Sequence, residues 1–308
     1  MNQALPAVRI LPPSRALLDS VRQELGENLP PEHRPLLGLL SLSDFLTVAT
    51  VLHQERAVGR LILPMERVRP TMEAIGALGL YVRRGAIDFV EPRGPVEGTD
   101  HARHELPSGT PGATHGMFYF GVAEDLLEGA DVLEQTNQHA MLASLFGYPE
   151  CCVQLFTRTG EERLDKTPDS IPDLGPFPRL MNPCLRYLFG FQLIFHFPCS
   201  PRCERSRTLL EGRLAYLKRH APSAAGVAAL GTGITLYGPR TGVALVTRSR
   251  QVAEQTFEVE EVVAAGSKLP ALLAHAPSPV QLTLHGAHAF ELGGVAVEDV
   301  HAFVARYE

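Results

Sequence analysis

The sequences Gly147-Tyr-Pro-Glu-Cys-Cys152 and His196-Phe-Pro-Cys-Ser-Pro-Arg-Cys203 dominate the organisation of this chain. Together they contain four of the five cysteines among 308 residues. From Cys152 to Cys199 the groups lie 47 positions apart (199 minus 152), so only tertiary folding can join them. Unrelated buried cysteines do not readily explain two such groups, each with prolines close by.

Proline also indicates where helices begin near both groups. Pro149 suits the first turn of a helix that contains Cys151 and Cys152. Pro201 suits the start of a longer helix, which would place Cys199 near its N-cap. Because the positive end of a helix stabilises a thiolate, we expect a lowered pKa for Cys199.

Four thiolates in one place could hold zinc or an iron–sulfur cluster. Adjacent side chains on a helix diverge by about 100°, so the pair Cys151-Cys152 favours a larger cluster over one tetrahedral ion. Alternatively, one of these two cysteines is a ligand and the other lies in the core. The spacings also differ from the paired Cys-x2-Cys of ordinary zinc sites. The candidate metal ligands are Cys151, Cys152, Cys199 and Cys203, with His196 as a weaker candidate.

Other roles for the same residues stay open. A redox-active or disulfide-forming pair would account for the grouping, and so would packing of cysteine as a small apolar side chain. In a thiol-dependent enzyme, Cys199 would be the nucleophile and His196 its general base. Cys184 is expected to lie in the core. His139 could approach the cysteines from a preceding helix.

The two segments resemble the signature of an uncharacterised prokaryotic family, a domain of unknown function. That signature is Gly-Tyr-Pro-x-Cys-Cys, followed some tens of residues on by His-x-Pro-Cys-Ser-x-x-Cys. The resemblance covers about residues 116–215 and implies one site that contains Cys151, Cys152, His196, Cys199 and Cys203. It implies no established reaction. A fainter resemblance is to accessory proteins of ribosomal-peptide natural-product pathways, which hold a precursor peptide for other enzymes.

The pattern of apolar residues predicts an α+β fold in three parts. Residues 1–95 form a small α/β part, and 96–114 form a flexible loop or linker rich in Pro, Gly, Asp and His. Residues 115–221 form a mainly helical part with the cysteines. Residues 224–308 form a mostly antiparallel β part, in which residues 298–307 are expected to be a terminal amphipathic helix.

Composition excludes several classes of protein. Hydrophobic residues make up 45% of the chain and charged residues 20%, which is ordinary for a globular protein. A net charge of −6 gives no general attraction to nucleic acid or to anionic membranes. No secretory signal and no apolar run long enough for a membrane span is visible, so we expect a cytoplasmic protein.

Two functional hypotheses follow. The first is a binding or accessory protein that holds a peptide or partner protein for biosynthetic enzymes, with the cysteines as a structural or metal site. An extended peptide could add to an exposed strand edge in the third part. The second is an iron–sulfur or thiol-dependent enzyme that uses Cys151, Cys152, Cys199 and Cys203 with His196. The sequence contains no P-loop, Gly-x-Ser-x-Gly or His-Glu-x-x-His motif, which favours binding.

Overall fold

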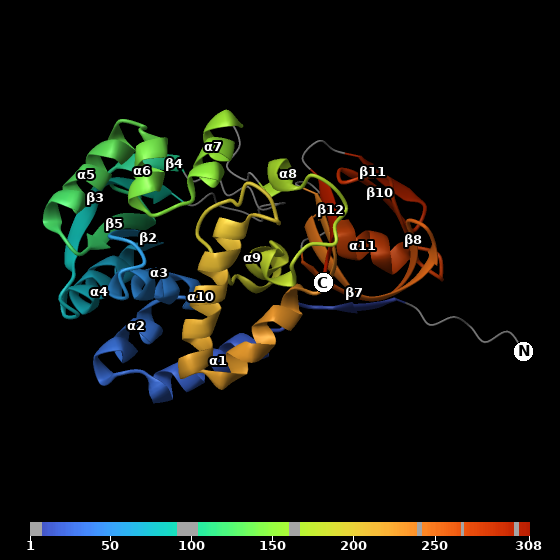
Figure 1. Cartoon of the computed structure of the whole chain (residues 1–308), viewed down its shortest axis with the longest axis horizontal. Helices are drawn as coiled ribbons and strands as arrows, with labels where there is room; N and C mark the ends of the chain where they lie inside the picture. The colour runs from blue at the N-terminus through green and yellow to red at the C-terminus, as the bar shows by residue number, and fades with distance from the viewer. Residues whose placement is uncertain (1–7, 91–103, 160–166, 239–241, 266–267, 299–301) are drawn as a thin grey trace, which may run out of the picture.

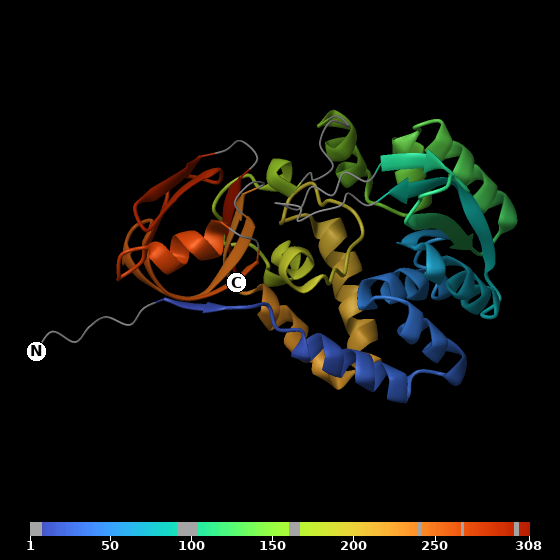
Figure 2. The same ribbon diagram turned by 180° about the vertical axis from the view of Figure 1, so that it is seen from behind.

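Two largely antiparallel sheets lie toward opposite ends of the long axis of the molecule, with helices between them (Figures 1 and 2). The structure is a computed structural model that describes residues 8–90, 104–159, 167–238, 242–265, 268–298 and 302–308. This arrangement confirms the predicted α+β class.

The helices lie mostly in the first three quarters of the chain. They are α1 (Ala16–Asn28), α2 (Arg34–Leu39), α3 (Leu42–Leu52), α4 (Met65–Gly76), α5 (Glu124–Gln135), α6 (His139–Leu145), α7 (Glu150–Arg158), α8 (Thr167–Ser170), α9 (Cys184–Phe189), α10 (Glu204–His220) and α11 (Lys268–His275). Short 3-10 helices are η1 (Pro31–His33), η2 (Arg179–Met181) and η3 (Pro222–Gly231). No helix of the described residues is long and apolar enough to cross a membrane.

The N-terminal sheet has the strand order β2-β5-β3-β4. Its strands are β2 (Val58–Pro64), β3 (Tyr81–Val90), β4 (His104–Pro107) and β5 (His115–Gly121). β4 corrects the expectation of a loop or linker over 96–114, because it pairs with β3; residues 96–103 lie outside the described part of the chain.

β5 is buried on both faces because its alternate side chains enter two separate cores. Phe118 and Phe120 pack in the core that also contains residues of α3 and α4. Met117 and Tyr119 pack in the core that contains residues of α5 and α6. This sheet therefore combines β2 and β3, from the predicted N-terminal part, with β5, which was predicted to belong to the helical part.

The C-terminal sheet has the strand order β11-β10-β9-β8-β7-β6-β12. Its strands are β6 (Gly233–Gly238), β7 (Gly242–Ala253), β8 (Thr256–Ala265), β9 (Gln281–Leu284), β10 (Ala289–Leu292), β11 (Val295–Glu298) and β12 (Phe303–Tyr307). β1 (Arg9–Leu11) pairs in parallel with β8, so the start of the described chain belongs to this sheet (Figure 2).

The predicted terminal helix is wrong, because its last residues form strand β12 beside β6. Phe303, Val304 and Ala305 are all fully buried, and consecutive strand residues point to opposite faces. Phe303 enters the core next to the helices, whereas Val304 enters the core around α11. An amphipathic helix would bury only one stripe, so burial on both sides requires a strand here.

Candidate metal centre

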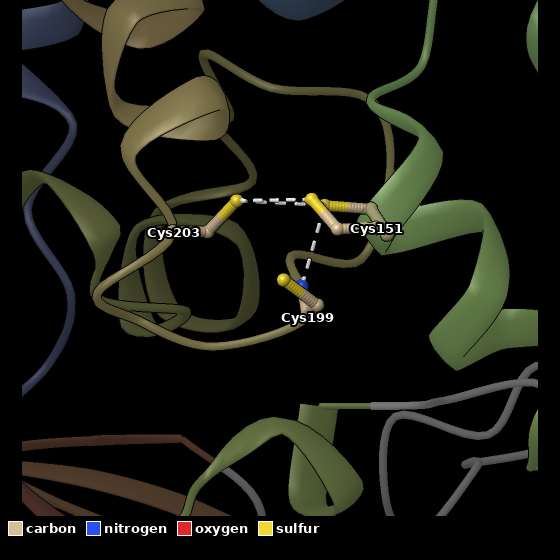
Figure 3. Close-up of side chains that lie close together, drawn as sticks. Cys151, Cys199 and Cys203 are labelled. Atoms are coloured by element: carbon tan, nitrogen blue, oxygen red, sulfur yellow. Dashed lines mark hydrogen bonds between the residues drawn. The ribbon is translucent and has the colours of Figure 1, made fainter.

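Two helix N-termini and the segment before the second one bring the cysteines together. Cys151 and Cys152 lie in the first turn of α7, which follows Pro149. Cys203 is the N-cap residue of α10, and Cys199 lies four positions earlier in the chain. Figure 3 shows the side chains of Cys151, Cys199 and Cys203 directed toward one another.

The four sulfur atoms lie within 4.8 Å of one another. The Sγ atom of Cys203 lies 3.7 Å from that of Cys151 and 3.7 Å from that of Cys152. The Sγ atoms of Cys151 and Cys152 are 3.9 Å apart. These separations far exceed a disulfide bond of about 2.05 Å, and all four residues are free thiols. The group could hold a metal ion.

The adjacent cysteines converge, although their positions on a helix predict divergence. The Cα–Cβ bonds of neighbouring helical residues point apart by about 100°, but each Sγ atom can take any of three staggered positions about χ1. Cys151 and Cys152 thereby bring their sulfur atoms to the same group. Adjacency is therefore no barrier to a shared ion in this chain.

Helix α10 begins later than predicted, at Glu204 instead of near Pro201. Residues 200–203 form a turn in which the Cys203 N–H donates to the Ser200 carbonyl oxygen at 3.0 Å. The residue at the helix N-terminus is therefore Cys203, and the expectation that Cys199 occupies this position is wrong.

The pKa values of the thiols also differ from the prediction: the pKa of Cys203 is lowered, and that of Cys199 is raised. Burial alone would raise the pKa of Cys203, but hydrogen bonds from Ser206 and from the thiols of Cys199 and Cys151 lower it to about 7. Burial and the neighbouring Cys152 raise the pKa of Cys199, opposite to the predicted direction. Burial also raises the pKa of Cys152, to about 12.

A buried serine connects the thiols to His196. The Ser206 Oγ atom lies 3.3 Å from Cys152 Sγ, 3.4 Å from Cys203 Sγ and 2.8 Å from His196 Nε2. The Cys199 backbone N–H donates to Cys152 Sγ at 3.3 Å. Both donors would stabilise negative charge on the sulfur atoms. Ser206 was detectable in the sequence only through its position three residues after Cys203, on the same face of a helix.

His196 lies beside the thiol group and is not one of its members. Its Nε2 atom contacts Ser206, and its ring lies 5.2 Å from the ring of Tyr148. Burial, followed by the positive charges of Arg213 and Arg56, lowers the pKa of His196 to about 3. The imidazole is therefore neutral at physiological pH, with Ser206 between it and the nearest thiols.

An apolar cavity of about 310 Å³ adjoins the thiol group. Cys152 and His196 both line it, so a molecule in this cavity would lie next to the proposed site. Most of the remaining wall is apolar or aromatic and includes Phe146, Tyr148 and Phe195. Cavities of this size and composition are typical of small-molecule sites.

The remaining candidates lie outside the thiol group. Cys184 is fully buried in the large core, with its Sγ atom 3.3 Å from Thr235 Oγ1, so its predicted core position is confirmed. His139 lines the apolar cavity and packs edge-on against Phe156. It does not belong to the group of close metal-ligating side chains.

The family signature that the two cysteine segments resemble remains a prediction. The structure places its cysteines in one group and its histidine next to that group. The chain matches no protein-family model, no curated protein and no solved structure.

Proposed function

We propose that this protein is a binding or accessory protein in which Cys151, Cys152, Cys199 and Cys203 hold one zinc ion. The observation that carries the proposal is the spacing of the sulfur atoms. Zinc–sulfur bonds of about 2.3 Å in a tetrahedron place the sulfur atoms about 3.8 Å apart. The separations of 3.7, 3.7 and 3.9 Å in this group fit that edge length.

The same spacing favours a single ion over an iron–sulfur cluster. In a four-iron cluster each cysteine binds a different iron, so the sulfur ligands stand around the outside of the whole cluster. Sulfur atoms that all lie within 4.8 Å of one another leave room for one ion at their centre. A single iron ion would also suit four thiolates, so the test includes iron.

Hydrogen-bond donors and helix N-termini around the group would stabilise thiolates bound to a metal, and they oppose the burial that raises the pKa of Cys152 and Cys199. Two helix N-termini point toward the group, at α7 and at α10. The Cys199 N–H donates to Cys152 Sγ, and the Ser206 hydroxyl reaches two sulfur atoms. A thiolate has no proton and can only accept hydrogen bonds. The Ser206 hydroxyl therefore donates to sulfur, and the His196 Nε2–H donates to the Ser206 oxygen.

A zinc ion with four cysteine ligands has no open position for substrate, which is typical of structural zinc. Its effect here would be to fasten α7, α10 and the segment before α10 together. Helix α7 and the segment before α10 form one wall of the apolar cavity through Cys152, His196 and Phe197. The metal would thus hold a binding cavity in shape.

We also propose that the bound partner is an extended peptide or protein segment, and that it binds at the C-terminal sheet. β11 stands at one end of the strand order and pairs with β10 alone among the described strands. An extended peptide or partner segment could add to its free edge. Val295 on this strand is exposed, which gives such a segment an apolar contact.

A thiol-dependent enzyme is the second candidate function. Cys152 and His196 line the same cavity, so a bound molecule would meet a protonated thiol and a neutral imidazole, which Ser206 connects by hydrogen bonds. In this alternative the four cysteines carry no metal. It predicts a turnover that is lost in Cys152→Ser.

Metal analysis separates these candidates. Protein purified anaerobically without a metal-affinity tag is expected to contain one zinc per chain, with four sulfur ligands at about 2.3 Å by X-ray absorption. Cys199→Ser is expected to lose most of the zinc. The matched control Cys184→Ala removes a buried thiol from outside the group and keeps the zinc.

Other results would contradict the zinc proposal. Stoichiometric iron with acid-labile sulfide would indicate a cluster, and iron without sulfide would indicate a single iron ion. Protein that contains no metal would contradict the zinc proposal and favour the thiol-dependent enzyme. X-ray absorption on the unmodified protein decides between these results even if Cys199→Ser fails to fold.

A further inference from the structure

A second cavity lies against the apolar one and has a polar lining. Its volume is about 250 Å³, and Thr47, Arg56 and Gln192 contribute to its wall. It shares four lining residues with the apolar cavity, so the two form adjacent compartments. The shared residues are Arg60, Phe146, Tyr148 and Phe195.

Arg56 is the unusual residue of this second cavity. Its side chain is 7% exposed, and its Nη2–H donates to the Thr47 carbonyl oxygen at 3.1 Å. Its Nε–H is buried and has no hydrogen-bond partner among the described residues. Burial lowers the pKa of Arg56 to about 10, so the guanidinium stays charged at neutral pH. A buried N–H on a charged group is costly without an acceptor.

Arg56 has no ion-pair partner of its own among the described residues, although the nearby Glu55 carboxylate acts on its charge from a longer distance. Arg60 pairs with Glu134, and Arg213 pairs with Glu55. No ion pair joins Arg56 to a carboxylate within the described part of the chain. Asp44 also lines this cavity and brings a negative charge to it; its carboxylate accepts a hydrogen bond from the Ser41 hydroxyl at the start of α3.

We infer that the two adjacent cavities together bind a monocarboxylate with an aromatic or bulky apolar group. The carboxylate would accept hydrogen bonds from the guanidinium of Arg56, which lines the polar cavity, and would neutralise its charge. The apolar group would occupy the cavity beside Cys152, among Phe146, Tyr148 and Phe195.

Charge and volume select this class of ligand. Arg56 is buried in the cavity wall and forms no ion pair among the described residues, and the planar N–H groups of a guanidinium suit a carboxylate. A phosphate dianion would require further donors to replace its hydration. An apolar cavity of about 150 Å³ can hold a benzene molecule, so about 310 Å³ has room for an indole ring.

The inference deepens the proposed binding role and rests on it. The shared chemistry is a carboxylate close to an apolar group, which occurs in free aryl acids and at the C-terminus of a peptide. Both sources present the same groups to Arg56 and to the aromatic wall.

The absence of tryptophan from this chain gives a direct test. Indole fluorescence reports only on an added probe when it is excited beyond the absorption of tyrosine. The probes are indole-3-acetate and its neutral amide, and the N-acetylated dipeptide Gly-Trp and its neutral amide. The full-length protein, with its zinc content measured in the same sample, is titrated against each probe.

The expected result is saturable binding of at least one acid, at least tenfold tighter than its amide. A preference for indole-3-acetate identifies a free acid as the ligand, and a preference for Gly-Trp identifies a peptide C-terminus. Arg56→Gln is expected to reduce the affinity for the acid to that for the amide. The control Arg69→Gln alters an exposed arginine paired with Glu73 and leaves binding unchanged.

A second variant tests the apolar compartment without touching Arg56. Ala143 lines the apolar cavity but not the polar one. Ala143→Phe would therefore place an aromatic ring in the apolar cavity only. All four probes are then expected to lose at least tenfold in affinity. The acid-to-amide ratio in the unmodified protein decides the question even if Arg56→Gln does not fold.

Equal affinity for acid and amide, or no saturable binding of any probe to zinc-containing protein, would overturn the inference while leaving the metal proposal intact. Protein that lacks zinc yet prefers the acid would contradict the metal proposal and support the carboxylate site. The two failures are therefore distinguishable in one set of samples.

Discussion

The Nε2 atom of His196 lies 2.8 Å from the Oγ atom of Ser206, and the same hydroxyl reaches two cysteine sulfur atoms. Ser206 is fully buried, so water does not replace it when it is removed. We therefore expect Ser206→Ala to retain the fold and to bind zinc 10- to 100-fold more weakly, as is usual for groups that support metal ligands. Competition with a chromogenic chelator measures this change.

The matched control for this prediction is Ser170→Ala. Ser170 is also buried, and its hydroxyl donates to the Thr167 carbonyl oxygen. It lies outside the thiol group, so its loss should leave zinc affinity unchanged. Equal zinc affinity in Ser206→Ala and Ser170→Ala would show that the hydroxyl does not support the metal site.

Buried, neutral His196 predicts a pH dependence of stability. Its pKa falls from an ordinary 6.5 to about 3 in the folded protein, chiefly through burial. The unfolded chain therefore binds a proton below pH 6.5 that the folded chain does not bind until about pH 3. This contribution to stability is complete above pH 6.5 and is lost as the pH falls through that window.

The comparison with His196→Gln isolates this group from the other titrating residues. The unmodified protein is expected to lose about 2 kcal/mol more than the variant between pH 7 and pH 5. Denaturant unfolding at each pH gives both free energies of unfolding. Parallel pH profiles for the two proteins would rule out a buried neutral imidazole.

Some features of the site were predictable from local sequence because they depend on local physics. Proline before Cys151 marks the start of α7, and the grouped thiols indicate a shared site. The start of α10 was placed too early because the turn Ser200–Cys203 also accommodates Pro201. Arg56 carries no local signal, since its burial and its unpartnered N–H arise from contacts between distant segments.

The same division applies to the fold. Several strands of the C-terminal sheet alternate between apolar and polar residues, and others begin at or just after glycine. Both features can be recognised in the sequence. The segment over 298–307 has helical periodicity, yet residues 303–307 pair with β6. Likewise, nothing within β5 reveals that its partners are β2 and β3, because pairing between distant strands is not encoded in either strand alone.

Because Phe303 lies in the buried strand β12, its truncation is expected to lower the free energy of unfolding strongly. Its side chain is fully buried and stacks on Tyr237 with ring centroids 5.0 Å apart. Phe303→Ala is expected to lower the free energy of unfolding by about 3–5 kcal/mol. Val295→Ala in exposed β11 should change it by less than about 0.5 kcal/mol. Chemical denaturation of both variants checks this, and a similar small loss in each would speak against β12.

Substitution by alanine is expected to have opposite effects on stability at Gly231 and at Gly212. A methyl group on Gly231 would overlap the backbone carbonyl oxygen of Arg179, which cannot rotate away as a side chain would. Gly231 also accepts a hydrogen bond from the Asn182 amide at 2.7 Å, which holds η2 and η3 together. Gly231→Ala is therefore expected to destabilise the protein by about 1–3 kcal/mol.

Gly212 lies on the exposed face of α10, with no atom within 4 Å of an added methyl group. Gly212→Ala should stabilise the protein by about 0.5–1 kcal/mol, because alanine loses less backbone entropy in a helix. Thermal unfolding of the two variants, each loaded with the same amount of zinc, gives the sign of both changes. A gain in stability from Gly231→Ala would mean that η2 and η3 do not pack closely. That outcome would also undermine the packing around Asn182, whose side-chain oxygen accepts the Cys184 N–H and the Thr235 hydroxyl.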